Sequence, residues 1–246
     1  AQPWVIKEAP AADYITLKFK INSEICVKGA NLAVEDAEKL LITFNGESVS
    51  NETNGWYVDK SIKTVALPEI QKGENELILK LPFGKRTSTE WCYILGDFGV
   101  RTEGAFSTIT APVEKFGFSS LTHQGLPFYG GNVTYQIPFV SNGGEVSVRE
   151  NLFRAPVIKA SVDGKEAGYI AFSPYEISLG KLPAGEHMLE LTVFGNRVNT
   201  FGTLHNCDRK EDWYGPNAWR TTGDLWAYEY QIRPTGLLKA PVLMER

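Results

Sequence analysis

Side chains that could bind a small ligand are concentrated in one segment, residues 205–220. Gly, Pro and Asn interrupt this segment and no hydrophobic period runs through it, so we expect an irregular loop. An indole or phenol ring can stack on the C–H face of a sugar ring, and Arg or Asn can hydrogen-bond to its hydroxyl groups. The candidate ligand contacts are His205, Asn206, Trp213, Tyr214, Trp219 and Arg220.

The same residues also fit a structural role. Long ordered loops often pack on themselves, so Trp213 and Trp219 could seal the end of the core while Arg220 hydrogen-bonds to backbone carbonyls. In that case His205 and Asn206 would tie the loop down. The exposure of the two tryptophans distinguishes the two interpretations.

The sequence carries no motif of a known catalytic or metal-binding class. It contains no G-x-S-x-G, H-E-x-x-H, phosphate-binding loop or G-x-G-x-x-G pattern. Its 3 histidines and 3 cysteines are widely spaced, which favours neither a metal site nor a disulfide framework. We therefore expect no enzymatic activity in this chain and no cofactor.

Charge and hydropathy argue against two classes of partner. The net charge of −4 gives no broad basic surface for phosphate backbones, so nucleic acid is not an expected partner. The sequence has no apolar run near the ~18 residues that a membrane-spanning helix needs. We expect no membrane partner either.

Short alternating stretches predict the elements that position these residues. Apolar and polar residues alternate at 15–21, 77–81, 133–139 and 189–193, the period of a strand with one solvent-facing side. Asn45-Gly46 and Asp163-Gly164 supply the positive φ angles of tight hairpin turns. Further strands are expected at 32–35, 40–44, 91–95, 146–148 and 228–232. Many short strands with frequent turn residues indicate antiparallel β-sandwiches.

Two parts of the chain have similar patterns. Residues 40–86 contain a strand, Asn-Gly, an aromatic segment, Gly-Glu-Asn and an alternating strand, and residues 157–197 repeat this order with Asp-Gly and Gly-Glu-His. A repeat of this size predicts two similar domains in tandem. Residues 101–117 lose the alternation, so we place the boundary between Ala111 and Pro112. The expected fold is a pair of jelly-roll-like sandwiches, residues 1–111 and 112–246.

The order of these segments resembles galactose-binding-like jelly-roll domains. The matching segments are KGENELILKL and AGEHMLELTV, each after its hairpin, followed by LPFYGGNVTYQI, FGNRVNTFGTLHN, WYGPNAWR and YQIRPTGLL. The resemblance covers residues 14–238 and is strongest to the sugar-binding and accessory domains of glycoside hydrolase family 2 and related bacterial glycosidases. In such enzymes the active site lies in a barrel, whose alternating strands and helices this chain lacks.

The resemblance implies a non-catalytic module of a bacterial glycan-degrading enzyme. Its expected partners are an oligo- or polysaccharide and a catalytic glycosidase domain of the same parent chain, in an extracellular or periplasmic location. Such sandwiches sometimes carry a structural calcium ion, for which Asp97, Asp163 and Asp208 are candidate ligands. The alternative is a structural or protein-interaction module that binds no sugar.

Overall fold

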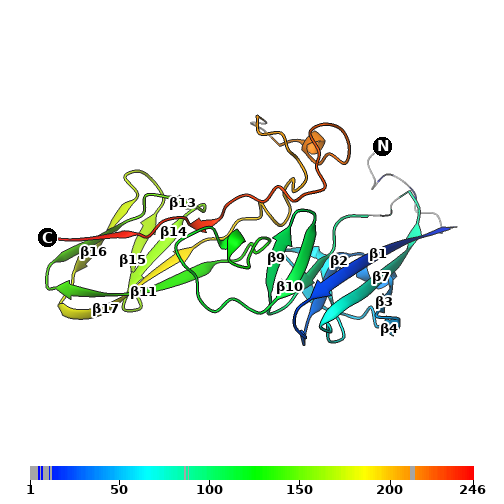
Figure 1. Cartoon of the computed structure of the whole chain (residues 1–246), viewed down its shortest axis with the longest axis horizontal. Helices are drawn as coiled ribbons and strands as arrows, with labels where there is room; N and C mark the ends of the chain where they lie inside the picture. The colour runs from blue at the N-terminus through cyan, green and yellow to red at the C-terminus, as the bar shows by residue number, and fades with distance from the viewer. Residues whose placement is uncertain are drawn as a thin grey trace. The chain divides into compact units, whose positions relative to one another are not determined.

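The computed structural model describes residues 13–85, 87, 89–210 and 214–246, together with residues 5, 7 and 11. They fall into two compact units, one formed by residues 1–99 and 107–112 and the other by residues 100–106 and 113–246. Strands and short 3-10 helices are the regular elements of the described residues (Figure 1). The all-β class expected from the sequence is confirmed.

Two sheets enclose the core of the first unit. The six-stranded sheet has the order β4-β3-β7-β1-β10-β9 and the four-stranded sheet the order β5-β6-β2-β8. β1 pairs with β10 in parallel, whereas the pairs β1–β7, β3–β7, β3–β4, β2–β6, β2–β8 and β5–β6 are antiparallel. The strands are β1 (Asp13–Ser23), β2 (Asn31–Glu35), β3 (Leu41–Phe44), β4 (Glu47–Val49), β5 (Thr53–Tyr57), β6 (Asp59–Ala66), β7 (Gly73–Phe83), β8 (Tyr93–Leu95), β9 (Gly99–Glu103) and β10 (Phe106–Thr110).

The second unit is built in the same way from two further sheets. One has the order β11-β17-β14-β15, the other β16-β12-β19, and β13 pairs with β18. The strands are β11 (Val133–Asn142), β12 (Glu145–Arg149), β13 (Phe153–Arg154), β14 (Ile158–Val162), β15 (Lys165–Ile170), β16 (Glu176–Lys181), β17 (Ala184–Val193), β18 (Gly236–Leu237) and β19 (Val242–Glu245). The 3-10 helices are η2 (Ala37–Lys39) in the first unit, and η3 (Leu121–His123) and η4 (Pro216–Ala218) in the second.

Alternation along the strands explains where the cores lie. Leu77, Leu79 and Leu81 of β7 are at most 7% exposed because every second side chain of a strand points to the same face. Leu189 and Leu191 of β17 are fully buried for the same reason. Buried apolar residues form two separate clusters, and each contains side chains from both sheets of one unit. The β-sandwich architecture follows, while a galactose-binding-like identity stays a prediction.

The two hairpins that the sequence predicted are present and occupy the same place in their sheets. Four strands of the first unit have the order β1-β7-β3-β4, and the second unit has the order β11-β17-β14-β15. The first turn residue has a φ of 49° at Asn45 and 50° at Asp163, the left-handed region that Asn and Asp adopt most readily. This common order concerns four strands of each unit, and a duplication of the whole unit stays a prediction.

A set of hydrogen bonds fastens the first hairpin to the long strand beside it. The Asn45 amide donates to the Glu76 carbonyl (2.9 Å), and the Glu76 amide donates to Asn45 Oδ1 (2.8 Å). Asn45 Nδ2 donates to Asn75 Oδ1 (2.9 Å), and Asn75 Nδ2 donates to the Gln71 carbonyl (2.7 Å). Asn75 Oδ1 also accepts from the Gln71 amide (2.9 Å). Asn75 is 1% exposed, so these bonds replace the water that its polar atoms lose.

The second hairpin is fastened by the same pattern with ionisable side chains. The Asp163 amide donates to the Met188 carbonyl (2.9 Å), and the Met188 amide donates to Asp163 Oδ1 (2.9 Å). His187 Nδ1 lies 2.6 Å from Asp163 Oδ2, and its Nε2 lies 3.0 Å from the Pro183 carbonyl. Pro183 stands at the position that Gln71 has in the first hairpin. Because proline has no amide hydrogen, the side chain of His187 does not have to accept a bond there, as Asn75 does from the Gln71 amide. Both ring nitrogens face acceptors, which favours the protonated imidazolium.

The His187–Asp163 pair makes the stability of the second unit depend on pH. The hydrogen bond to Asp163, followed by that to Pro183, raises the pKa of His187 above 6.5. The Met188 amide, followed by His187, lowers the pKa of Asp163 below 3.8. The His187 contribution is fully present below pH 6.5 and is lost as pH rises through the raised pKa. The Asp163 contribution is present above pH 3.8 and is lost as pH falls through the lowered pKa.

We predict that amide exchange at Met188 accelerates as pH rises from about 6 to about 9, beyond the intrinsic pH effect on exchange. The double variant Asp163→Asn/His187→Asn reproduces the chemistry of Asn45 and Asn75 and should lose this excess. The Glu76 amide of the first unit serves as an internal control. Equal pH dependence at Met188 in wild type and variant would contradict the assignment.

One carboxyl group lies inside the second core. Glu150 is fully buried, and its Oε1 accepts from the Leu152 amide (2.9 Å). Among the described residues, its Oε2 has no hydrogen-bond partner. Burial raises the pKa of Glu150, while the amides of Leu152 and Asn151 and the charge of Lys239 oppose the rise. A carboxyl with a raised pKa stabilises the fold most at low pH, and this contribution is lost as pH rises through the folded pKa.

We predict that Glu150→Gln raises the urea midpoint of the second unit above about pH 7, because it keeps the acceptor for Leu152 and removes a buried charge. The advantage over wild type should shrink as pH falls towards about 5, where wild-type Glu150 holds its proton. A variant that is less stable than wild type above about pH 7, but not near pH 5, would show that the ionised carboxylate stabilises the fold.

The structure differs from the sequence pattern in three places. Residues 228–232, expected as a strand, are irregular, and residues 101–117, where the sequence alternation is lost, contain most of β9 and all of β10. His187, expected at the surface because it lies near the start of a strand, is partly exposed as a residue, but its side chain faces Asp163 and Pro183 and is 8% exposed. In each case a tertiary contact overrides the local pattern.

Candidate ligand-binding site

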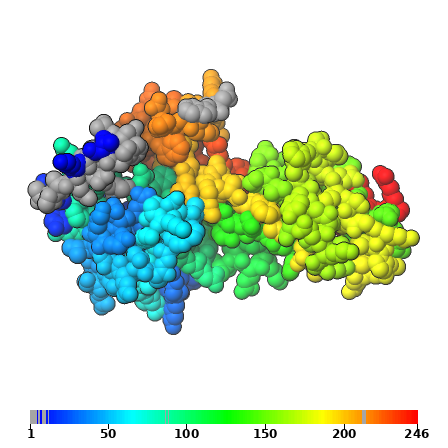
Figure 2. Space-filling model, turned by 180° about the vertical axis from the view of Figure 1, so that it is seen from behind, coloured from blue at the N-terminus to red at the C-terminus, as the bar shows by residue number. Residues whose placement is uncertain are grey.

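The residues singled out by the sequence lie in one long irregular part of the second unit. Residues 199–235, here called the aromatic segment, connect β17 to β18 and carry only η4 and an isolated bridge among their described residues. Figure 1 shows the segment in orange outside the sheets of its unit, and Figure 2 shows it at the surface. Asn199 ties its ends together: Nδ2 donates to the Arg233 carbonyl (2.7 Å), and Oδ1 accepts from the Arg233 amide (3.0 Å).

Backbone hydrogen bonds hold two stretches of the segment side by side. Residues 204–208 and 225–231 run antiparallel, with an isolated bridge between Asn206 and Trp226. Their other backbone bonds are Ala227 N to His205 O (2.9 Å), Cys207 N to Leu225 O (2.9 Å) and Gln231 N to Leu204 O (2.7 Å). The pairing is too short to form a regular ladder. It is sufficient to fix the positions of the side chains that the two stretches carry.

These stretches gather aromatic rings, here called the aromatic cluster. Its members are Phe128, His205, Trp226, Tyr228 and Tyr230. The His205 ring centre lies 6.0 Å from Trp226 and 5.2 Å from Tyr230, and Tyr228 meets Trp226 edge-on at 4.4 Å. His205 Nδ1 donates to the Ala227 carbonyl (2.9 Å), so Nε2 is the acceptor in the neutral ring.

The cluster has a buried side and a solvent-facing side. Tyr228 is 72% exposed, whereas Asn206, which forms the isolated bridge with Trp226, is 9% exposed. Asn206 Oδ1 accepts from the Asp208 amide (2.8 Å), which is a tie within the loop. A partly supported and partly open aromatic surface can take up the apolar face of a ligand without a deep cavity.

Trp219 does not seal the core. It follows η4 and is 45% exposed, which favours an open surface over a plug at this position. Trp213, the other tryptophan expected either to contact a ligand or to seal the core, lies outside the described residues. Arg220 pairs with the Asp208 carboxylate at 3.6 Å, and the Arg220 side chain is 25% exposed.

Tyr214 has a cationic neighbour. The Arg233 guanidinium donates a hydrogen bond to the Tyr214 hydroxyl and lies 4.6 Å from the centre of its ring. The predicted residues therefore separate into groups: His205 and Asn206 at the aromatic cluster, Tyr214 with Arg233, and Arg220 with Asp208. Of these, the aromatic cluster presents the most exposed ring.

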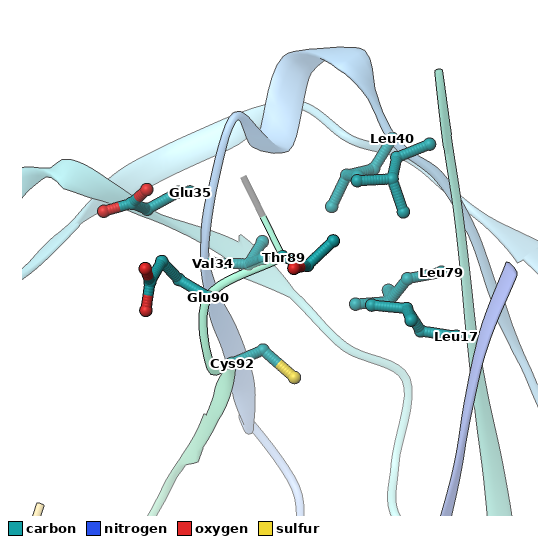
Figure 3. Close-up of a pocket in the computed structure, with 9 residues that line it drawn as sticks. Leu17, Val34, Glu35, Leu40, Leu79, Thr89, Glu90 and Cys92 are labelled. Atoms are coloured by element: carbon teal, nitrogen blue, oxygen red, sulfur yellow. The ribbon is translucent and has the colours of Figure 1, made fainter. Parts of the chain in front are cut away.

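Two small cavities lie among the described residues, one in each unit. The larger has a volume of about 20 Å³ and lies in the first unit. In Figure 3, Leu17, Leu40 and Leu79 face its interior, and Glu35 and Glu90 point to one side. A cavity in the second unit has about 10 Å³. Sites for small molecules usually have volumes of about 300 to 1,000 Å³, so neither of these two cavities could hold a glycan.

The described residues form neither a metal-binding cluster nor a membrane-spanning helix. Within the described ranges, no three His, Cys, Asp or Glu side chains are arranged to hold a metal ion. Asp163 bonds to His187, and Asp208 pairs with Arg220. No helix in the part of the chain that the structure describes is long and apolar enough to cross a bilayer.

Comparisons with known proteins give little further information. No model of a protein family matches the chain, and no curated protein matches it. Among the solved structures that are similar to the chain is a rhamnosidase from Novosphingobium sp. PP1Y. The identity is 18%, the TM-score is 0.34, and the match covers 93% of this chain but 22% of the rhamnosidase chain. This chain thus spans less than a quarter of that protein. At this TM-score the likeness carries no argument about what the chain does.

Sequence reasoning missed three members of the aromatic cluster. Tyr228 and Tyr230 were assigned to an expected strand at 228–232, and Trp226 was not singled out. The three residues occupy every second position of the sequence. Phe128 lies far away in sequence, and only the fold brings its ring to 5.2 Å from Tyr230. Alternate spacing places residues on one face of an extended stretch, so the three rings could have been found as a group.

Proposed function

We propose that this chain is a non-catalytic carbohydrate-binding or accessory module of a larger bacterial glycan-degrading enzyme. The observation that carries the proposal is the aromatic cluster, with Tyr228 72% exposed on a segment fixed by Asn199 and by backbone bonds. The sequence resemblance to accessory domains of bacterial glycosidases supports the same reading. The protein would work outside the cytoplasm, in the periplasm or outside the cell, where its polysaccharide partner is found.

The proposed mechanism is stacking on an open surface. The exposed rings of Tyr228 and Trp219 would take up the C–H faces of sugar units, and nearby polar groups would bond their hydroxyls. A shallow site of this kind gives weak binding, with a Kd on the order of 0.1 to 1 mM. Such affinity suits a module that keeps an enzyme near an insoluble or repeating substrate, because several weak contacts add up on a polymer.

A glycan screen followed by calorimetric titration tests the proposal. We expect binding to at least one plant, microbial or host polysaccharide at a concentration on the order of 1 mM in sugar units. Wild-type chain that binds none of a broad panel would contradict sugar binding. An aryl-glycoside panel in the same assay tests the non-catalytic part, since hydrolysis by this chain alone would contradict it.

A protein-interaction module is the second candidate, because large apolar side chains are exposed elsewhere. Phe172 is 86% exposed, Val140 68% and Trp56 55%. If these residues form an interface, the chain should associate with the catalytic part of its parent enzyme and Phe172→Ser should weaken that association. Association without any glycan binding would favour this bracing role over sugar capture.

A further inference from the structure

The aromatic segment ends at a short strand pairing. β18 follows the segment directly and pairs with β13 over two residues of each strand. The Leu238 amide extends this pairing by donating to the Leu152 carbonyl (2.9 Å). By comparison, β11 and β17 of the same unit pair along ten residues each. The contact of residues 152–154 with residues 236–238, here called the junction, is therefore the part of the second unit that can open with the fewest lost bonds.

Glu150 holds one side of the junction in place. Its Oε1 accepts from the Leu152 amide (2.9 Å), and its own amide donates to the Tyr175 carbonyl (3.0 Å). Leu152 thus bonds to Glu150 through its amide and to Leu238 through its carbonyl. A movement of the Glu150 side chain would shift Leu152, and with it the acceptor that Leu238 uses.

The other oxygen of Glu150 lies where a neutral carboxyl is favoured. Glu150 is fully buried and Tyr135 is 6% exposed, and among the described residues both Glu150 Oε2 and the Tyr135 hydroxyl lack a hydrogen-bond partner. The two groups lie close enough to interact: burial raises the pKa of Tyr135, the Leu237 amide opposes the rise, and negative charge on Glu150 adds to it. A buried carboxylate with one unpaired oxygen costs more free energy than the protonated carboxyl. Glu150 therefore favours its proton while the junction is closed.

Among the described residues, Lys239 supplies the charge that acts on Glu150. Burial raises the pKa of Glu150, and the Lys239 ammonium, after two backbone amides, opposes the rise. Lys239 is exposed, so solvent and salt screen its charge. The elements around Glu150 also bring two tyrosines to it, Tyr135 and Tyr175. The other charged or titratable side chains of these elements bond elsewhere or lie in solvent: Arg149 with Glu176 (2.7 Å), Arg154 with the Phe153 carbonyl (3.1 Å), and His123, which is exposed.

We propose that Glu150 is a pH-sensitive latch on the junction. With its proton bound, Glu150 stays buried and residues 236–238 stay paired with residues 152–154. When it loses the proton, the carboxylate reaches water by opening the junction, and the end of the aromatic segment loses one of its anchors. The bonds between Asn199 and Arg233 remain, so the segment loosens at its end and does not detach. A glycan site on that segment, which rests on the function proposed above, would bind more tightly at acidic than at alkaline pH.

The direction of the pH effect follows from proton linkage. Because the pKa of Glu150 in the closed junction is raised above 4.5, its contribution to closure is fully present below pH 4.5 and is lost as pH rises through the raised pKa. Above that pKa, each pH unit favours the open junction by up to about tenfold, because opening releases one proton.

Hydrogen exchange of the full chain, measured by mass spectrometry at about pH 5, 6.5 and 8, tests the latch without a glycan. After correction for the intrinsic pH effect, we expect residues 236–240 of wild type to exchange at least about tenfold faster at pH 8 than at pH 5. β11 should stay protected at each pH, because opening of the junction leaves its pairing with β17 intact. Since no glycan is present, failure of the latch and failure of glycan binding are distinguishable.

Two variants separate ionisation from packing. Glu150→Gln keeps the acceptor for Leu152 and cannot ionise, so its corrected exchange at the junction should change by less than about threefold over this pH range. Lys239→Gln removes an exposed charge that favours the carboxylate, so at low salt the acceleration should begin at a higher pH than in wild type.

Three outcomes would overturn the latch: no acceleration in wild type, the wild-type acceleration in Glu150→Gln, or acceleration of β11 by the same factor as the junction, which would show that Glu150 acts on the whole unit. Should Glu150→Gln fail to fold, Lys239→Gln decides alone. Acceleration that begins in this variant at the same pH as in wild type, or at a lower one, would contradict the assignment to Glu150.

Discussion

Leu79→Ala is expected to destabilise the first unit by about 2 to 5 kcal/mol, and Leu191→Ala is expected to do the same to the second. Leu79 is 2% exposed in the centre of β7, and Leu191 is fully buried near the end of β17. Each substitution removes buried methyl groups and leaves a cavity that a sheet core closes only in part. Because the two buried clusters are separate, each loss should stay within its own unit.

Hydrogen exchange measured by mass spectrometry in urea reports both units in one sample. Leu79→Ala should lower the unfolding midpoint of peptides from β1 and β7, and Leu191→Ala that of peptides from β11 and β17. Leu41→Ala is a matched control, since Leu41 is 61% exposed and its loss should change stability by less than about 0.5 kcal/mol. If either core variant shifted both units equally, the division into domains 1–111 and 112–246 would be wrong.

Tyr228→Ala is expected to weaken glycan binding by about tenfold or more, close to the loss of detectable binding at a shallow site. Tyr228 is the most exposed ring of the aromatic cluster, so its removal takes away a stacking surface and leaves the core untouched. Trp226→Ala should have at least as large an effect, because it also removes the ring that meets Tyr228 edge-on. Titration with the glycan found in the screen measures both.

Matched variants separate loss of contact from loss of fold. Tyr228→Phe keeps the ring and should retain most of the affinity. Tyr169→Ala removes a tyrosine that is 52% exposed on β15, outside the aromatic segment, and should bind like wild type. Weakened binding in the Tyr169 variant and unchanged binding in Tyr228→Ala would place the site elsewhere.

The sequence predicted the fold where local chemistry decides it. Alternating leucines in residues 77–81 and the Asn-Gly and Asp-Gly turns specify strands and hairpins through nearest-neighbour geometry, and both appear as expected. The β9–β10 hairpin was missed because its residues carry no clear alternation. Its place in the sheet depends on the parallel pairing of β10 with β1, a contact between residues far apart in the chain.

The candidate site was predicted less completely, for a similar reason. The loop and most of its polar residues follow from composition, but which rings meet is set by the antiparallel contact of residues 204–208 with 225–231. The sequence also did not reveal that His187 would pair with Asp163, although the Asp-Gly turn and the Gly-Glu-His run were both noted. The Asp163–His187 pair stands at the positions that Asn45 and Asn75 occupy in the first unit, where the two asparagines also bond to each other.

The most direct test of carbohydrate binding at the aromatic segment is hydrogen exchange of the wild-type chain with and without the glycan selected by the screen. The account predicts slower exchange in residues 204–208 and 225–231 when glycan is present, with the other strands of the second unit unchanged. Protection confined to another part of the chain, or no protection at a saturating glycan concentration, would contradict it.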